Sequence, residues 1–124
     1  TSDDLEVWVG RNNRQNDYLT LKLAGPADLW FHTKEIPGSH VILRVPPGAK
    51  VPETSILEAA LLAAHFSKAR HSSQVPVDFT QRKHVRKPAG AKPGMVIYDN
   101  QRTVYVTPSE EELRVILTRL HRES

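Results

Sequence analysis

The sequence predicts an α+β fold. We expect a single domain with a mainly antiparallel β-sheet, one long alanine-rich helix packed on one face, and a C-terminal helix. Short alternating apolar runs, typical of half-buried strands, recur at 5–9, 28–33, 41–45 and 75–80. Residues 56–66 are apolar nearly all round, as in a helix buried on most sides. A chain of 124 residues is long enough to bury a real core.

The segment after the first strand is polar and rich in turn residues. Residues 10–17 contain a glycine and four asparagines or aspartates, which tolerate turn conformations and bond to local backbone. Asn16 or Asp17 can cap a short helix that runs to about Ala24. The leucines that follow alternate, so the same stretch fits a strand equally well.

The central stretch, residues 28–44, is expected to form a β-hairpin around the turn at Pro37 and Gly38. Side chains alternate between the faces of a strand. The face expected to point toward the core carries Leu29, Phe31, Thr33, Val41, Leu43 and Val45. The opposite face collects many hydrogen-bonding groups beside one large ring: Asp28, Trp30, His32, His40, Ile42 and Arg44.

The long helix is expected over residues 55–70. Ser55 and Glu58 have the spacing of a capping box, which marks a helix start. Lys68 and Arg70 fall in the expected last turn, where cations suit the negative end of the helix dipole. We interpret them in that structural role.

A further hairpin and a final helix are expected near the C-terminus. Residues 95–98 and 103–107 would pair around a turn at 99–102. Ser109 would cap a helix over 109–122. The apolar stripe of that helix is Leu113, Ile116, Leu117 and Leu120.

Charge is distributed unevenly along the chain. The net charge is +3, yet no carboxylate lies between Asp78 and Asp99. That interval holds five cations, Arg82, Lys83, Arg86, Lys87 and Lys92. Such an asymmetry indicates a polyanion partner. Cysteine is absent, which excludes disulfides and thiolate metal sites, and no apolar run is long enough for a membrane span.

A basic groove with aromatic rings is the usual means of binding single-stranded RNA. The expected phosphate contacts are Arg11, Lys34, Arg82, Lys83, Arg86, Lys87 and Lys92. Bases or ribose would meet Trp30, His32 and His40, with Ser39 and Arg44 beside them. Protonation of either histidine would then strengthen phosphate contact at lower pH.

The hairpin residues leave an enzyme open as an alternative. Asp28, His32, Ser39 and His40 include the types of a nucleophile, a base and an orienting acid, and the histidines and carboxylate suit a metal. However, Asp28 and His32 would lie roughly 13 Å apart on an extended strand. No Gly-x-Ser-x-Gly phrase or P-loop occurs either. We therefore expect no enzymatic activity, no metal and no cofactor.

Four phrases in order resemble one family. They are Val-Gly-Arg-Asn-Asn at 9–13, Asp-Leu-Trp-Phe-His at 28–32 with Pro-Gly-Ser-His-Val at 37–41, the alanine-rich helix, and Val-Arg-Lys-Pro at 85–88 through Lys-Pro-Gly-Met-Val at 92–96. Over residues 5–107 the chain resembles the NFACT-R domain, the RNA-binding module of the NFACT proteins. These include bacterial RqcH or fibronectin-binding-protein-like factors and eukaryotic NEMF.

The resemblance implies a cytoplasmic role in ribosome-associated quality control. Such factors bind the obstructed large ribosomal subunit with its tRNA, and support untemplated C-terminal tailing of the stalled chain. The partners implied are tRNA, large-subunit rRNA, or both, and no membrane. The resemblance also implies that the chain is a piece of a larger factor, or a stand-alone version of the module. A fibronectin-binding adhesion module is the remaining alternative.

Overall fold

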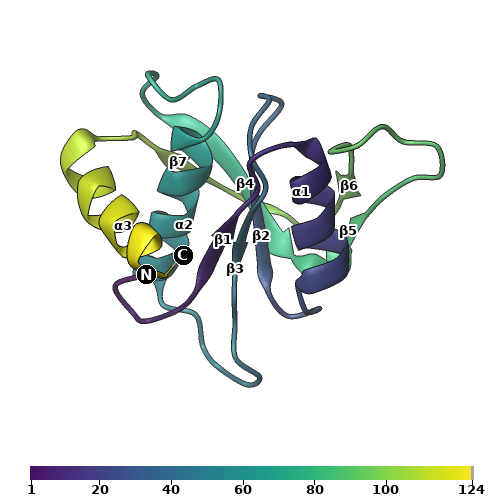
Figure 1. Ribbon diagram of the computed structural model, residues 1–124, viewed down its shortest axis with the longest axis horizontal. Helices are drawn as coiled ribbons and strands as arrows, with labels where there is room; N and C mark the ends of the chain where they lie inside the picture. Colours follow the sequence, from purple (N-terminus) through teal and green to yellow (C-terminus); the bar gives the residue numbers. More distant parts are fainter. Residues whose placement is uncertain (124) are drawn as a thin grey trace.

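The computed structural model describes the backbone of residues 1–123 and the side chains of residues 1–118. At its centre is a five-stranded antiparallel sheet with the order β1-β3-β2-β4-β7 (Figure 1). Its strands are β1 (Val7–Val9), β2 (Leu29–Thr33), β3 (Val41–Leu43), β4 (Val75–Gln81) and β7 (Arg102–Val106). This sheet, with helices packed on it in one domain, confirms the predicted α+β class.

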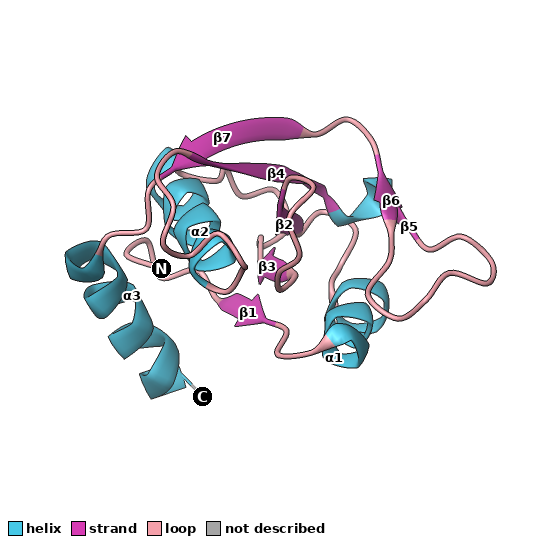
Figure 2. Ribbon diagram, turned by 90° about the horizontal axis from the view of Figure 1, so that it is seen from above, coloured by secondary structure: helices cyan, strands magenta, loops and turns pink. Residues whose placement is uncertain are grey.

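Both faces of the sheet are covered (Figure 2). One face carries two helices, α2 (Glu53–His65) and α3 (Glu110–Glu123). The other carries the short helix α1 (Asn13–Asp17), the π-helical turn η1 (Tyr18–Leu23) and a two-stranded sheet. That small sheet pairs β5 (Val85–Arg86) with β6 (Ile97–Tyr98), and the 3-10 turn η2 (Arg82–His84) precedes it.

The main core lies between the sheet and α2. The central hairpin is confirmed, because β2 and β3 pair antiparallel with Phe31 opposite Val41 and Leu29 opposite Leu43. Phe31, Val41 and Leu43 are fully buried on the side that the alternation predicts. The alanines that α2 presents to the sheet are Ala59, Ala60, Ala63 and Ala64. Their small side chains let helix and sheet approach closely.

A second, smaller core lies on the opposite face. Trp30, Ile42 and Val85 are buried there, with Leu19 and Tyr98 packed against them. This corrects the expectation that the face stays open for RNA. Of the two alternatives for the stretch after the polar loop, helix and strand, the helical one forms, as α1 and η1. η1 and the β5–β6 sheet supply the apolar side chains that close the face.

Three element boundaries differ from the prediction. Asn12, and not Asn16 or Asp17, caps α1, because its Oδ1 accepts a hydrogen bond of 2.9 Å from the Gln15 amide. The long helix begins at Glu53, two residues before Ser55. Ser55 is buried, and its hydroxyl donates to Asp3 at 2.7 Å instead of capping the helix.

The same helix ends at His65 and not at Arg70. Lys68 and Arg70 therefore follow it in the connection to β4, and do not form its last turn. From this position they can contact a ligand, whereas the predicted role at the end of the helix dipole does not apply.

The hairpin expected over residues 95–107 is wrong. β6 pairs with β5, placing Val85 opposite Tyr98, whereas β7 pairs with β4. Long-range pairing overrides the local turn. Ser109 does precede α3, and its Oγ accepts from the Glu112 amide at 3.4 Å. Leu113 and Ile116 are buried, whereas the side chain of Leu120 lies outside the described residues. No helix in the described part of the chain is long and apolar enough to cross a membrane.

Candidate nucleic-acid interface

The basic segment, residues 82–94, is held against α1 by one carboxylate. Lys87 Nζ lies 3.1 Å from Asp17 Oδ2, and the Gly94 amide donates to Asp17 Oδ1 at 3.1 Å. Lys87 also donates to the carbonyls of Lys92 and Met95, at 2.7 and 3.1 Å. Lys87 therefore braces the loop. Asp17 supplies from a distant part of the chain the negative charge that the segment itself lacks.

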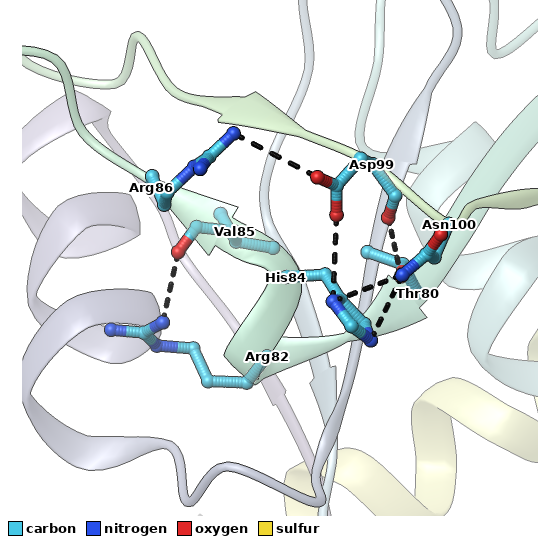
Figure 3. A network of polar contacts seen from close by, with 7 residues as sticks. All are labelled: Thr80, Arg82, His84, Val85, Arg86, Asp99 and Asn100. Carbon is cyan, nitrogen blue, oxygen red and sulfur yellow. Dashed lines mark hydrogen bonds and ion pairs between the residues drawn. The ribbon is translucent and has the colours of Figure 1, made fainter.

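A second polar network lies at the base of this segment (Figure 3). Asp99 is 3.4 Å from His84 Nδ1 and 3.7 Å from Arg86 Nη2, and its carbonyl accepts from Thr80 at 2.9 Å. Arg82 donates to the Val85 carbonyl at 3.0 Å. The long 3.7 Å contact leaves the Arg86 side chain 66% exposed, so its guanidinium remains available to a phosphate.

The five cations predicted from this segment thus divide into two kinds. Arg82 and Lys87 are partly buried and bonded to the protein's own carbonyls. Lys83, Arg86 and Lys92 are exposed. The exposed three form the part of the segment that can meet a polyanion.

Trp30 and His40 lie inside the domain, each with 1% of its surface exposed. This corrects the expectation that their rings are presented to a base. Trp30 contacts His32, His40 and Tyr98, with ring centroids 5.8, 5.3 and 4.6 Å apart. The rings therefore pack on one another and on the covering layer. His32 is only partly buried, and its ring lies against those of Trp30 and His40.

His40 joins β3 to α1 and η1. Its Nδ1 is 2.9 Å from the Thr20 hydroxyl, and its amide donates to Asn16 Oδ1 at 3.0 Å. Burial, together with the neighbouring His32, lowers the pKa of His40 to about 4. Burial also lowers the pKa of His32. This corrects the expectation that protonation of either histidine strengthens phosphate contact. Burial disfavours the charged form of both rings, so protonation would destabilise the packing around them.

Arg44 and Asp28 form an ion pair within the domain. Arg44 Nε lies 2.8 Å from Asp28 Oδ2, and its guanidinium lies over the Trp8 ring, 4.2 Å from the centroid. Asp28 also accepts the amides of Gly25 and Val45, each at 2.8 Å. Its two oxygens are thus engaged, and no three His, Asp or Glu side chains among the described residues are grouped to hold a metal.

An open groove of about 460 Å³ lies where three segments meet, toward the top of Figure 1. Its walls are residues 11–13 before and within α1, residues 37–39 of the hairpin tip, and residues 65–70 at the end of α2. Cations from two of these segments line it, Arg11, Lys68 and Arg70, and no carboxylate is among the lining residues. We name it the α2-end groove.

Backbone pairing fixes the floor of the α2-end groove. The Ser39 amide donates to the Phe66 carbonyl and the Lys68 amide to the Pro37 carbonyl, both at 3.0 Å. Gly38 lies between these bonds, opposite Ser67. A β-carbon at Gly38 would lie 2.8 Å from that of Ser67, so only glycine permits this approach. The Pro-Gly-Ser phrase thus joins the hairpin tip to the helix end.

The structure brings two of the predicted residues, Arg11 and Ser39, into this groove. It adds others that sequence reasoning did not assign to the site, namely His65, Phe66, Lys68 and Arg70. Lys34 is exposed at the hairpin tip and does not line the groove. The basic residues Lys68, Arg70 and His71 could have indicated this site from the sequence. They did not, because the helix was expected to continue to residue 70, whereas it ends at His65.

The sequence and the fold both match known proteins. A family model described as the NFACT protein RNA binding domain matches residues 1–100. "Rqc2 homolog RqcH" of Bacillus subtilis is 54% identical over 90% of this chain, and its namesake in Streptococcus suis is 49% identical over 87%. The chain spans 19% of the length of each of these relatives.

More distant relatives and a solved structure agree. "Coiled-coil domain-containing protein 25" of Mus musculus is 26% identical over 98% of this chain and 60% of its own length. The solved C-terminal part of the fibronectin/fibrinogen-binding protein from Streptococcus suis superimposes with a TM-score of 0.86 at 46% identity. That match covers 93% of this chain and 45% of the solved one. The chain therefore belongs to the NFACT-R family, the RNA-binding domain of RqcH- and NEMF-type ribosome quality control factors.

Proposed function

We propose that this domain grips tRNA, large-subunit rRNA, or both on an obstructed large ribosomal subunit in the cytoplasm. It thereby supports the parent factor in extending the C-terminus of the stalled chain. In this role the domain binds RNA and catalyses nothing itself. Membership of the RNA-binding family and the close likeness to RqcH support the proposal.

The observation that carries the proposal is the distribution of exposed cations on both sides of α1. Lys83, Arg86 and Lys92 lie on the basic segment, and Arg11 and Arg70 lie at the α2-end groove. Among the described residues, Asp17 and Asp99 are carboxylates that contact the basic segment. Each lies beside a cation, which reduces its repulsion of phosphates. Exposed cations that neutralise phosphates release counterions, which gives salt-dependent affinity for RNA.

Titration of fluorescent tRNA and of large-subunit rRNA fragments at several salt concentrations tests this proposal. Replacing Lys83, Arg86 and Lys92 together with Ala should weaken binding to both RNAs. The slope of log affinity against log salt should flatten by about 2 to 3, because each phosphate contact contributes about 0.7 to 1.

Lys50→Ala is the matched control, since Lys50 is exposed in the connection between β3 and α2, away from both basic surfaces. It should leave the slope unchanged. If the triple variant keeps the slope of the parent domain, the basic segment does not contact RNA phosphates.

The name of the solved streptococcal relative favours fibronectin binding as a second candidate. Immobilised fibronectin should then retain the domain after nuclease treatment, and the triple variant should still bind. Loss of retention after nuclease treatment would show that bridging RNA explains any capture.

A further inference from the structure

The α2-end groove combines an aromatic ring with cations on an open surface. Phe66 is partly buried, and its hydrophobic contacts tie it to the main core. The His65 ring meets it edge-on, with centroids 4.8 Å apart and planes at 76°. The Arg11 guanidinium lies over the Phe66 ring, with its carbon 5.7 Å from the centroid. Trp30 is buried and cannot stack on a ligand, whereas Phe66 lines an open groove beside cations.

The space between Arg11 and Phe66 is close to what a nucleobase needs. A flat base held between two groups requires about 7 Å, which is two van der Waals separations. The observed 5.7 Å separation would have to widen by about 1 to 2 Å for this contact. Because Arg11 is exposed, its side chain can move outward and settle on the second face of the base without disturbing the core.

We propose that the α2-end groove holds one unpaired RNA nucleotide, with its base between Phe66 and Arg11. The adjoining phosphates meet Lys68 and Arg70. The inference rests on the proposed function and names the form of RNA that this groove takes. Bases splayed out of single strands and loops are free to stack on aromatic rings and arginine planes, whereas bases in a duplex are stacked on their neighbours.

The volume and rigidity of the groove suit this ligand. About 460 Å³ lies within the range of roughly 300 to 1,000 Å³ typical of sites for small molecules. The two backbone bonds between 37–39 and 66–68 hold the floor in place before any ligand arrives. No carboxylate lines the groove beside these cations.

Two RNA probes test the inference, a short unstructured strand and a perfect duplex of the same composition. Phe66→Leu keeps an apolar side chain on the core and removes the ring. It should weaken binding of the unstructured strand by about 5- to 150-fold, the effect of losing one base–aromatic stack, and leave duplex binding within about twofold. Phe66→Tyr should bind both probes as the parent domain does.

Arg11→Gln gives an independent reading if Phe66→Leu lowers the stability of the domain, because Arg11 is exposed. It too should weaken binding of the unstructured strand more than binding of the duplex. Equal affinity of the parent, Phe66→Leu and Arg11→Gln proteins for the unstructured strand would overturn the inference. The proposed function is tested by a different result. It is contradicted if the triple variant of the basic segment binds tRNA and the rRNA fragments as tightly as the parent domain does.

Discussion

His40 shows how a single side chain can hold a binding surface without forming part of it. Its imidazole and its amide connect β3 to Thr20 and Asn16, which belong to the layer that covers the second face. That layer includes α1, whose Asp17 holds the basic segment. Neutral His40 therefore stabilises the support of both basic surfaces.

The stability of the domain should depend on pH through His40. Its folded pKa of about 4 lies below the ordinary histidine value of 6.5, so the unfolded chain binds the proton more readily. The stability that neutral His40 contributes is fully present above about pH 6.5 and is lost as the pH falls toward 4. The unfolding free energy in urea should drop by about 2 kcal/mol between about pH 7.5 and pH 5. The lowered pKa of His32 adds to the drop with the same sign.

His40→Gln should reduce this pH dependence, whereas His71→Gln should not, since His71 is exposed after α2. An unfolding free energy that stays constant from about pH 7.5 to pH 5 would contradict the assigned burial of His40.

Residue types alone did not distinguish a ligand-facing ring from a core ring. The alternation placed Trp30, His32 and His40 on the same side of the hairpin, and that side is correct. What the alternation could not give was the layer above them, because it depends on α1, η1 and β5–β6 folding back from elsewhere in the chain. Phe66 was not predicted as a site residue, because in the sequence it continues the apolar run of the long helix.

The elements of the domain differ in how far local sequence determines them. The β2–β3 hairpin follows from the alternation of its strands, and the alanine-rich helix follows from its long apolar run. Both form, although the helix begins and ends earlier than expected. The pairing of β6 with β5, and of β7 with β4, joins segments whose partners local patterns do not identify. The groove, likewise, depends on a bridge between Gly38 and Ser67, which are far apart in sequence.

The basic segment should loosen when its attachment to α1 is removed. Asp17→Asn deletes the ion pair with Lys87 and weakens the acceptor of the Gly94 amide. Hydrogen exchange of the Gly94 amide should become faster by about fivefold or more, since a net hydrogen bond contributes about 1 kcal/mol. Nuclear magnetic resonance of the labelled domain measures this rate directly.

Asp99→Asn is the comparison variant, because Asp99 is exposed and contacts His84 and Arg86 at the base of the segment. It should leave exchange at Gly94 near the parent rate. Slow exchange at Gly94 in the Asp17→Asn protein would mean that other contacts hold the loop.

The whole molecule is a sheet covered on both faces, so its RNA-binding candidates lie at the margins and not across the sheet. The basic segment projects beside α1 (Figures 1 and 2), and the α2-end groove is lined by the start of that helix, the hairpin tip and the end of α2. Asn13 links the two, since it lines the groove and packs against Gly94. One short helix therefore supports both surfaces.

The backbone bonds under the α2-end groove have a kinetic consequence. A floor that is already formed needs no rearrangement beyond Arg11, so charge should govern how fast RNA is captured, and the stack how long it stays. Stopped-flow measurements should show slower association in the triple variant of the basic segment, and faster dissociation of the unstructured strand in Phe66→Leu. Capture and residence time would then be set by different residues, so that either can change while the other is kept.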